Sequence, residues 1–309
     1  MELLIAMVIS SIVTSGLLYL VVEIMQVDRR EASLDQVQRD MQRAINYIGD
    51  DLQEALYVYS DPASIATLLG ADTQFPNETE DTPVLAFWRV DPIEDNLPDC
   101  TSYAAGTPAL SQCESLRIRQ ASYTLVVYVQ RTNDGNANWP GQSRLIRYEL
   151  SKYTDTATMA VRKGYRDPAD LEDGASSFET WVPDTTGGNP AGTSAVLVDF
   201  VMAPTATLDR SPLSDPTEPC SSYGTNASGD FLYQVVPNTT TTTTNTSFFA
   251  CVRSADTDTE ERANQDVYVF LRGNAYDGPS GSINMASDES ALPVLETRVL
   301  VKGVINKRI

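Results

Sequence analysis

Cysteine and carboxylate are the side chains in this sequence whose types and spacing bear on chemistry. The chain contains four cysteines, Cys100, Cys113, Cys220 and Cys251, and no histidine. No C-x-x-C pair occurs, which argues against zinc and favours two disulfides in an exported domain, with four free buried thiols as the alternative. Three pairings are open; the sequential one, Cys100–Cys113 with Cys220–Cys251, is favoured because it closes two local loops.

Two acidic segments carry oxygen ligands for calcium. "DGNANW" (134–139) alternates like the start of a calcium loop, but Trp139 replaces the glycine and Leu145 occupies the position of the bidentate glutamate. "SADTDTEE" (254–261) clusters carboxylates. A hairpin turn and a solvated acidic loop are the favoured interpretations, so calcium remains an alternative and no cofactor is expected.

The composition and the motif content argue against catalysis, and the net charge argues against a nucleic-acid partner. Without histidine the chain lacks a general base that titrates near neutral pH, and no nucleophile-elbow, P-loop or dinucleotide motif occurs. With 42 acidic residues, chance carboxylate pairs are inevitable. A net charge of −20 disfavours phosphate binding. We therefore predict a protein that is not an enzyme and has no nucleic-acid partner.

The chemistry-bearing residues lie beyond an N-terminal segment of membrane length. Residues 3–22 carry no charge, and as a helix they span about 30 Å, the thickness of a bilayer core. A cleaved signal peptide would need a basic n-region and a small-residue cleavage site, which are missing. A buried core helix rarely needs so long an uncharged run. A membrane-inserted helix is therefore expected.

The helical pattern continues beyond this run. Apolar residues recur every three or four positions on one face, at Leu34, Val37, Met41, Ile45, Ile48, Leu52, Ala55 or Leu56, and Tyr59, while Asp50 and Asp51 lie with the charged residues opposite. We predict one helix over residues 1–60, about 85–90 Å long. Its half 1–25 is apolar all round, its half 26–60 is amphipathic, and "SDP" (60–62) is its stop. The amphipathic half should pack on the chain's own head; a coiled-coil stalk is the alternative.

The remainder, residues 61–309, reads as a β-rich extracytoplasmic head with long loops. "SYTLVVYVQ" (122–130) and "SRLIRYELSKY" (143–153) alternate around a turn-forming loop, which predicts a hairpin. An antiparallel sheet packed on the helix gives an α+β fold. The expected strands are 84–90, 115–120, 122–130, 143–153, 194–202, 231–236, 247–253, 266–273 and 296–305.

The N-terminal residues resemble a known family. "MELLIAMVIS", followed by a membrane-length run and an amphipathic helix, resembles the start of type IV pilins and of the pseudopilins of type II secretion. Glu2 matches the glutamate of the family's N-terminal segment, and Met1 matches the residue before that glutamate. Family members carry a basic leader ending in glycine and three residues ahead of these two positions, so both are expected upstream of Met1. The head's size and its hairpin most resemble pseudopilins for cyanobacterial hormogonium polysaccharide secretion.

The resemblance implies a fold, a role and partners. The fold is one long N-terminal helix with an antiparallel β-sheet head. The role is a structural subunit of a type IV pilus-like or type II secretion-like filament that serves polysaccharide secretion or motility, with prepilin-type N-terminal methylation. Glu2 is the assembly residue and pairs with the N-terminal amine of a neighbour. Major pilins usually carry a proline where Tyr19 stands, which favours a minor pilin or pseudopilin.

The implied partners are other pilins or pseudopilins, a prepilin peptidase, a platform protein and an assembly ATPase. The implied location is the inner membrane with the head in the periplasm, followed by a periplasmic or extracellular filament. By the positive-inside rule, Arg29 and Arg30 alone would place the head in the cytoplasm, whereas the expected disulfides imply an exported head. A basic leader upstream of the apolar run would resolve this conflict. Two alternative roles are a filament-tip adhesin that binds carbohydrate and a single-pass, membrane-anchored sensor.

Overall fold

The computed structural model describes residues 2–79, 81–93, 97–133, 138–169, 177–204, 220–226, 228–237, 247–253, 264–276 and 291–304. Its elements, in chain order, are α1 (Glu2–Gln53), β1 (Ala55–Val58), α2 (Pro62–Leu69), β2 (Asp81–Pro92), η1 (Cys100–Ser102), α3 (Pro108–Arg119), β3 (Ala121–Thr132), β4 (Ser143–Ser151), β5 (Tyr153–Asp155), β6 (Ala160–Val161), β7 (Thr193–Val201), η2 (Ser221–Tyr223), β8 (Tyr233–Val236), β9 (Phe248–Arg253), β10 (Asn264–Leu271) and β11 (Leu295–Val304).

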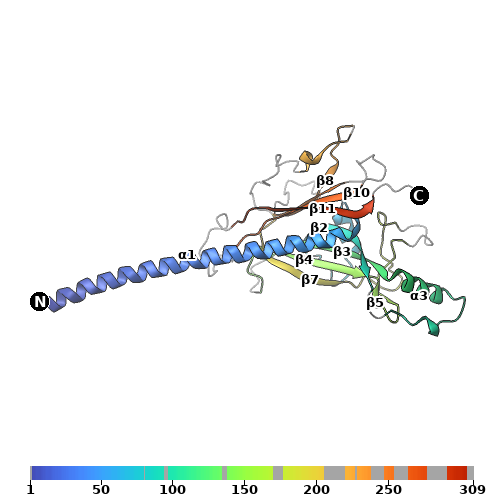
Figure 1. Ribbon diagram of the computed structural model, residues 1–309, viewed down its shortest axis with the longest axis horizontal. Coiled ribbons are helices and arrows are strands. Elements are labelled where there is room, and N and C mark those ends of the chain that lie inside the picture. Colours follow the sequence, from blue (N-terminus) through green and yellow to red (C-terminus); the bar gives the residue numbers. More distant parts are fainter. Residues whose placement is uncertain are drawn as a thin grey trace.

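Apart from the short β5-β6 pair, the described strands form two antiparallel sheets beside the long helix. One has five strands in the order β1-β2-β3-β4-β7, and the other has four in the order β11-β10-β9-β8. Figure 1 shows α1 projecting far from the head at its N-terminal end and running along the sheets at its C-terminal end. This is the α+β, pilin-like arrangement expected from the sequence, although the strands form two sheets where one was expected.

The main core lies between the C-terminal half of α1 and the two sheets. Met41, Ile45, Ile48 and Leu52 of α1 are at most 1% exposed and belong to one apolar cluster with residues of both sheets. This is the stripe that the sequence pattern identified, and it is buried in the chain's own head. The helix that carries the membrane-length segment is therefore also part of the head's core.

The five-stranded sheet is apolar on both faces. In β2, Phe87 faces the main core, whereas Trp88 faces a second core that α2 and a segment around Trp181 cover. Burial on both faces explains why "VLAFW" reads as a continuous apolar run. In the four-stranded sheet, the outer face packs around the Cys220–Cys251 disulfide and Phe249.

The predicted hairpin is confirmed. β3 pairs with β4 in antiparallel register from Thr124–Ser151 to Thr132–Ser143. The expected strands at 84–90, 194–202, 231–236, 247–253, 266–273 and 296–305 also correspond to β2, β7, β8, β9, β10 and β11.

The expected strand at 115–120 is wrong, because residues 115–119 form the C-terminal part of α3 and Gln120 is its C-terminal cap. Thr107 caps the helix, its Oγ1 accepting a hydrogen bond from the Leu110 N–H at 3.3 Å, and Pro108 occupies the first turn. The alternation in "LRIR" suggested a buried strand face, but Ile118 is 83% exposed. The N-terminal cap signals were the better guide here.

The long helix ends at Gln53, earlier than the predicted position 60. Ala55 and Val58, both buried, follow in β1, where the register against β2 shifts between Ala55 and Tyr57. The predicted stripe continued at Ala55 or Leu56 and at Tyr59; Ala55 is buried in the main core and Tyr59 in the second core, so burial on two faces of the sheet reproduced the helical spacing. The "SDP" segment starts a helix instead of stopping one, because Asp61 accepts a hydrogen bond from the Ala63 N–H at 3.2 Å and caps α2.

Candidate functional site

The N-terminal half of α1 presents an apolar surface on every side. Among the described residues, this is the one helix long and apolar enough to cross a membrane. Its large apolar side chains are 49% to 81% exposed: Leu3, Ile5, Met7, Val8, Ile9, Ile12, Val13, Leu17, Leu18, Tyr19, Leu20, Val21, Val22, Ile24, Met25 and Val27. A helix that is apolar all round needs an apolar environment, either lipid or other helices.

The hydroxyl groups within this surface are satisfied by the helix itself. Ser11 Oγ donates to the Val8 carbonyl at 2.8 Å, and Thr14 Oγ1 donates to the Ser10 carbonyl at 2.8 Å. Apart from its chain neighbours and the backbone of its own helix, no atom of the described residues lies within 4 Å of a Cβ built on Gly16. Because these side chains are small, a second helix can approach the backbone of α1 closely at this position.

The assembly residue predicted from the sequence lies at the very start of this surface. α1 begins at Glu2, whose side chain is outside the described part of the structure. Tyr19, which stands where the resemblance to major pilins would place a proline, is helical and 73% exposed. The helix therefore runs through this position without a break.

A buried carboxylate joins α1 to the five-stranded sheet. Asp51 is 6% exposed and accepts hydrogen bonds from three neighbouring strands: from Arg89 of β2, from Tyr128 Oη of β3 at 2.5 Å and from Arg147 Nε of β4 at 2.8 Å. The sequence pattern placed Asp51 on the solvent side of the helix, which is wrong. The signal was present as Arg89 and Arg147 within otherwise apolar strands.

The charges around Asp51 are balanced by two further carboxylates. Arg89 Nε lies 2.7 Å from an Asp91 oxygen, and Arg147 donates to Glu149 at 2.6 Å. Burial by itself would lower the pKa of Arg147, but its hydrogen bonds to Asp51 and Glu149 outweigh that effect and raise it. Burial and the Asp51 charge raise the pKa of Tyr128, which stays a neutral donor. The network fixes the helix to the sheet.

Two buried amides connect the two sheets. Gln265 of β10 pairs with the backbone of Val58 in β1, accepting from its N–H at 2.9 Å and donating to its carbonyl at 2.8 Å. Gln130 of β3 donates to Ser143, Ser247 and the Met202 carbonyl at 2.8 to 2.9 Å. Both sheets and α1 are thus held as one unit.

The cysteines are joined as Cys100–Cys113 and Cys220–Cys251, the sequential pairing favoured by the sequence. The first disulfide ties η1 to α3, and the second ties β9 to the residue before η2. Of the calcium candidates, 134–137 and 254–261 lie outside the described residues. Within the described part of the chain, no group of three or more carboxylate or cysteine side chains is arranged to hold a metal.

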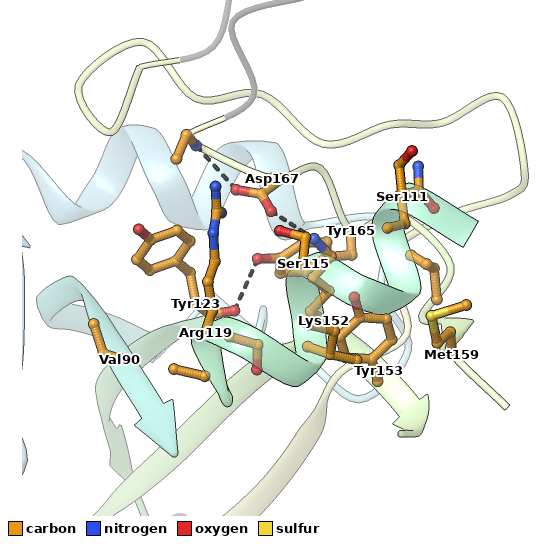
Figure 2. A pocket seen from close by; sticks show the side chains of 16 residues that line it. Val90, Ser111, Ser115, Arg119, Tyr123, Lys152, Tyr153, Met159, Tyr165 and Asp167 are labelled. Atoms are coloured by element: carbon orange, nitrogen blue, oxygen red, sulfur yellow. Dashed lines mark hydrogen bonds and ion pairs between the residues drawn. The ribbon is translucent and has the colours of Figure 1, made fainter. Parts of the chain in front are cut away.

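A cavity of about 640 Å³ lies at the end of the head away from the N-terminus. α3, the beginning of β3, β5, β6 and the segment 165–169 line it. Figure 2 shows Arg119, Tyr123, Tyr153 and Asp167 around it. Lys152 Nζ lies 2.6 Å from Asp167, and this bond outweighs the effect of burial and raises the pKa of Lys152. No pattern in the sequence indicated this cavity, because one of its walls is α3, part of which was expected to be a strand.

Comparison with known protein families, with curated proteins and with solved structures found no match to this chain.

Proposed function

We propose that this chain is a structural subunit, of the minor pilin or pseudopilin type, in a filament assembled from the inner membrane through α1. The observation that carries the proposal is the double use of one continuous helix. Its first half is apolar on every side, and its second half is built into the head's core. A filament of such subunits covers the apolar half with neighbouring helices.

The energetics favour a covered helix. Each fully exposed Leu, Ile, Val or Met side chain forgoes about 1.5–3 kcal/mol of burial. Lipid supplies that environment before assembly, with the head outside the inner membrane, and a helical bundle supplies it afterwards. The patch around Gly16, with hydroxyls already bonded to the helix, suits close helix–helix contact.

Glu2 has a specific part in this proposal. A carboxylate at the start of an apolar helix is expensive in a low-dielectric bundle unless it is paired. Pairing with the N-terminal amine of a neighbouring subunit offsets that cost and fixes the axial register between subunits. The same family role brings in a prepilin peptidase, a platform protein and an assembly ATPase as partners, and it makes the chain structural, not catalytic.

A single-pass membrane anchor with an extracytoplasmic sensor head is the second candidate, because the same exposed helix supports it. The two differ in where the protein accumulates. In the native host, filaments sheared from cells and the membrane fraction are separated and probed for the wild-type chain and for the variants Glu2→Ala and Glu23→Ala. Glu23 is the matched control, because it is an exposed glutamate on the same helix.

We expect the wild-type and Glu23→Ala chains in the filament fraction, and Glu2→Ala mainly in the membrane fraction. A wild-type chain found only in membranes refutes the filament proposal and supports the anchor. A Glu2→Ala chain that enters filaments normally leaves the filament role standing but refutes the pairing.

A further inference from the structure

The cavity at the far end of the head has the features of a ligand site. It lies next to α3 and β5, which Figure 1 places at the opposite end of the molecule from the N-terminus. A ligand there meets no obstruction from a membrane or filament that holds α1. The volume of about 640 Å³ is within the usual range for small-molecule sites, about 300–1,000 Å³.

The walls of the cavity are pre-formed. Tyr165 is 5% exposed, and its hydroxyl donates to the Tyr123 carbonyl at 2.8 Å. Its ring packs edge-on against Trp88, which lies in the core. The disulfide at Cys113 joins α3 to η1, and the Gln120 carbonyl at the end of α3 accepts from the Ile93 N–H, just after β2, at 2.8 Å. A ligand therefore pays little to order the site.

Arg119 supplies a positive charge that the protein does not neutralise. It lies in the last turn of α3, and within the described part of the chain it has no ion-pair partner. Lys152, the other cation at the cavity, is already bonded to Asp167. In a chain of net charge −20, an unpaired, solvent-exposed guanidinium that lines a cavity is suited to a carboxylate ligand, which it can bind through two parallel hydrogen bonds.

The rest of the lining suits a sugar. Tyr123 and Tyr153, both partly exposed, present aromatic rings, and Ser111, Gln112 and Ser115 offer polar groups that both donate and accept hydrogen bonds. Of the lining strands, β3 is paired with β2 on one side and β4 on the other and offers no edge to an extended peptide, whereas β5 and β6 pair with each other in a two-stranded sheet.

We propose that this cavity binds a segment of an acidic saccharide, with Arg119 holding a uronate carboxylate and Tyr153 contacting a sugar ring. The inference goes beyond the proposed filament role and does not depend on it, since the site is complete within one head.

The test uses the full chain, purified in a detergent without a sugar headgroup, and isothermal titration calorimetry. The probes are an oligomer of galacturonic acid, the matched neutral galactose oligomer and poly-glutamate. Arg119→Gln is compared with Arg117→Gln, because Arg117 is exposed on the same turn of α3 but does not line the cavity. Tyr153→Ala tests the ring contact.

We expect saturable binding of the galacturonate oligomer, weakened at least about tenfold by Arg119→Gln and changed by less than about twofold by Arg117→Gln. Tyr153→Ala should weaken it severalfold. The proposal is overturned if the galacturonate oligomer shows no saturable binding, if the neutral oligomer binds the wild-type chain equally well, or if Arg117→Gln and Arg119→Gln weaken binding equally. Poly-glutamate binding as tightly, with the same dependence on Arg119, identifies a peptide site and also overturns it.

Discussion

Replacing Asp51 by asparagine tests the link between the helix and the sheet. Asp51 is 6% exposed, and its partners Arg89 and Arg147 are 18% and 12% exposed. The substitution keeps the shape of the side chain and one acceptor oxygen but removes the charge, so two guanidinium groups lose their shared counter-charge. Removing one partner of a buried ion pair costs about 3–5 kcal/mol.

The structure places this substitution at the lower end of that range. Arg89 keeps Asp91, Arg147 keeps Glu149, and the remaining amide oxygen can still accept from the Tyr128 hydroxyl. We therefore expect a loss of about 3 kcal/mol in the free energy of unfolding, which corresponds to a fall of roughly 1 M in the urea midpoint if the slope is about 3 kcal/mol per M.

The assay is urea unfolding of the full chain in detergent, followed by tryptophan fluorescence. Trp88 and Trp181 lie together in the core on the outer face of the five-stranded sheet, with ring centroids 5.4 Å apart, and report on that sheet. Asp50→Asn is the matched control, because Asp50 is an exposed neighbour of the same charge on the same helix. Its midpoint should stay close to that of the wild type.

Two results would refute the reasoning. One is an equal midpoint for Asp51→Asn and Asp50→Asn, which would mean that the buried charge contributes nothing to the fold. The other comes from a double-mutant cycle with Tyr128→Phe. If Tyr128→Phe costs as much in an Asp51→Ala chain, which has no acceptor for the hydroxyl, as in the wild type, the hydroxyl and the carboxylate are not coupled.

Two further predictions concern pH and close packing. Burial raises the pKa of Tyr59, Tyr128, Tyr148 and Tyr165, so above pH of about 10 the unfolded chain holds fewer protons than the folded chain. The free energy of unfolding should therefore be insensitive to these groups below that pH and should fall above it by up to about 1.4 kcal/mol per pH unit per tyrosine, measured as urea midpoints; a flat alkaline profile contradicts this. Gly192→Ala should destabilise the protein by about 1–3 kcal/mol, because the new Cβ would lie 2.3 Å from the Tyr148 ring, whereas Gly187→Ala, with nothing within 4 Å, should change the thermal midpoint little.

The sequence predicted an element correctly where its apolar side chains recurred with one period along the whole element. The spacing from Val37 to Leu52 identified the buried stripe of α1, and the alternation in residues 122–130 and 143–153 identified the β3–β4 hairpin. In both cases burial, of one helix face or of an unbroken strand, requires apolar residues at regular positions, and this regularity can be recognised in the local sequence.

Prediction failed where tertiary contacts replaced the local pattern. Asp51 looked like a solvent-facing carboxylate, because its partners Arg89 and Arg147 are 38 and 96 residues away along the chain. Ala55 and Tyr59 continued the helical spacing, although Ala55 is buried in the main core and Tyr59 in the second core, on opposite faces of the sheet. The cavity near Arg119 is formed by separate segments between α3 and residue 169. Residue spacing within one segment cannot predict that these segments come together.

The continuity of α1 also determines how the protein bears mechanical load. The helix runs lengthwise along the strands of the head, as Figure 1 shows, and Met41, Ile45 and Ile48 contact the core along its length. A pull on the N-terminal half is therefore transmitted directly into the head as shear, and the apolar contacts and the Asp51 hydrogen bonds bear it at the same time. Because these contacts must break together and not one after another, the C-terminal half of α1 resists being pulled out of the head.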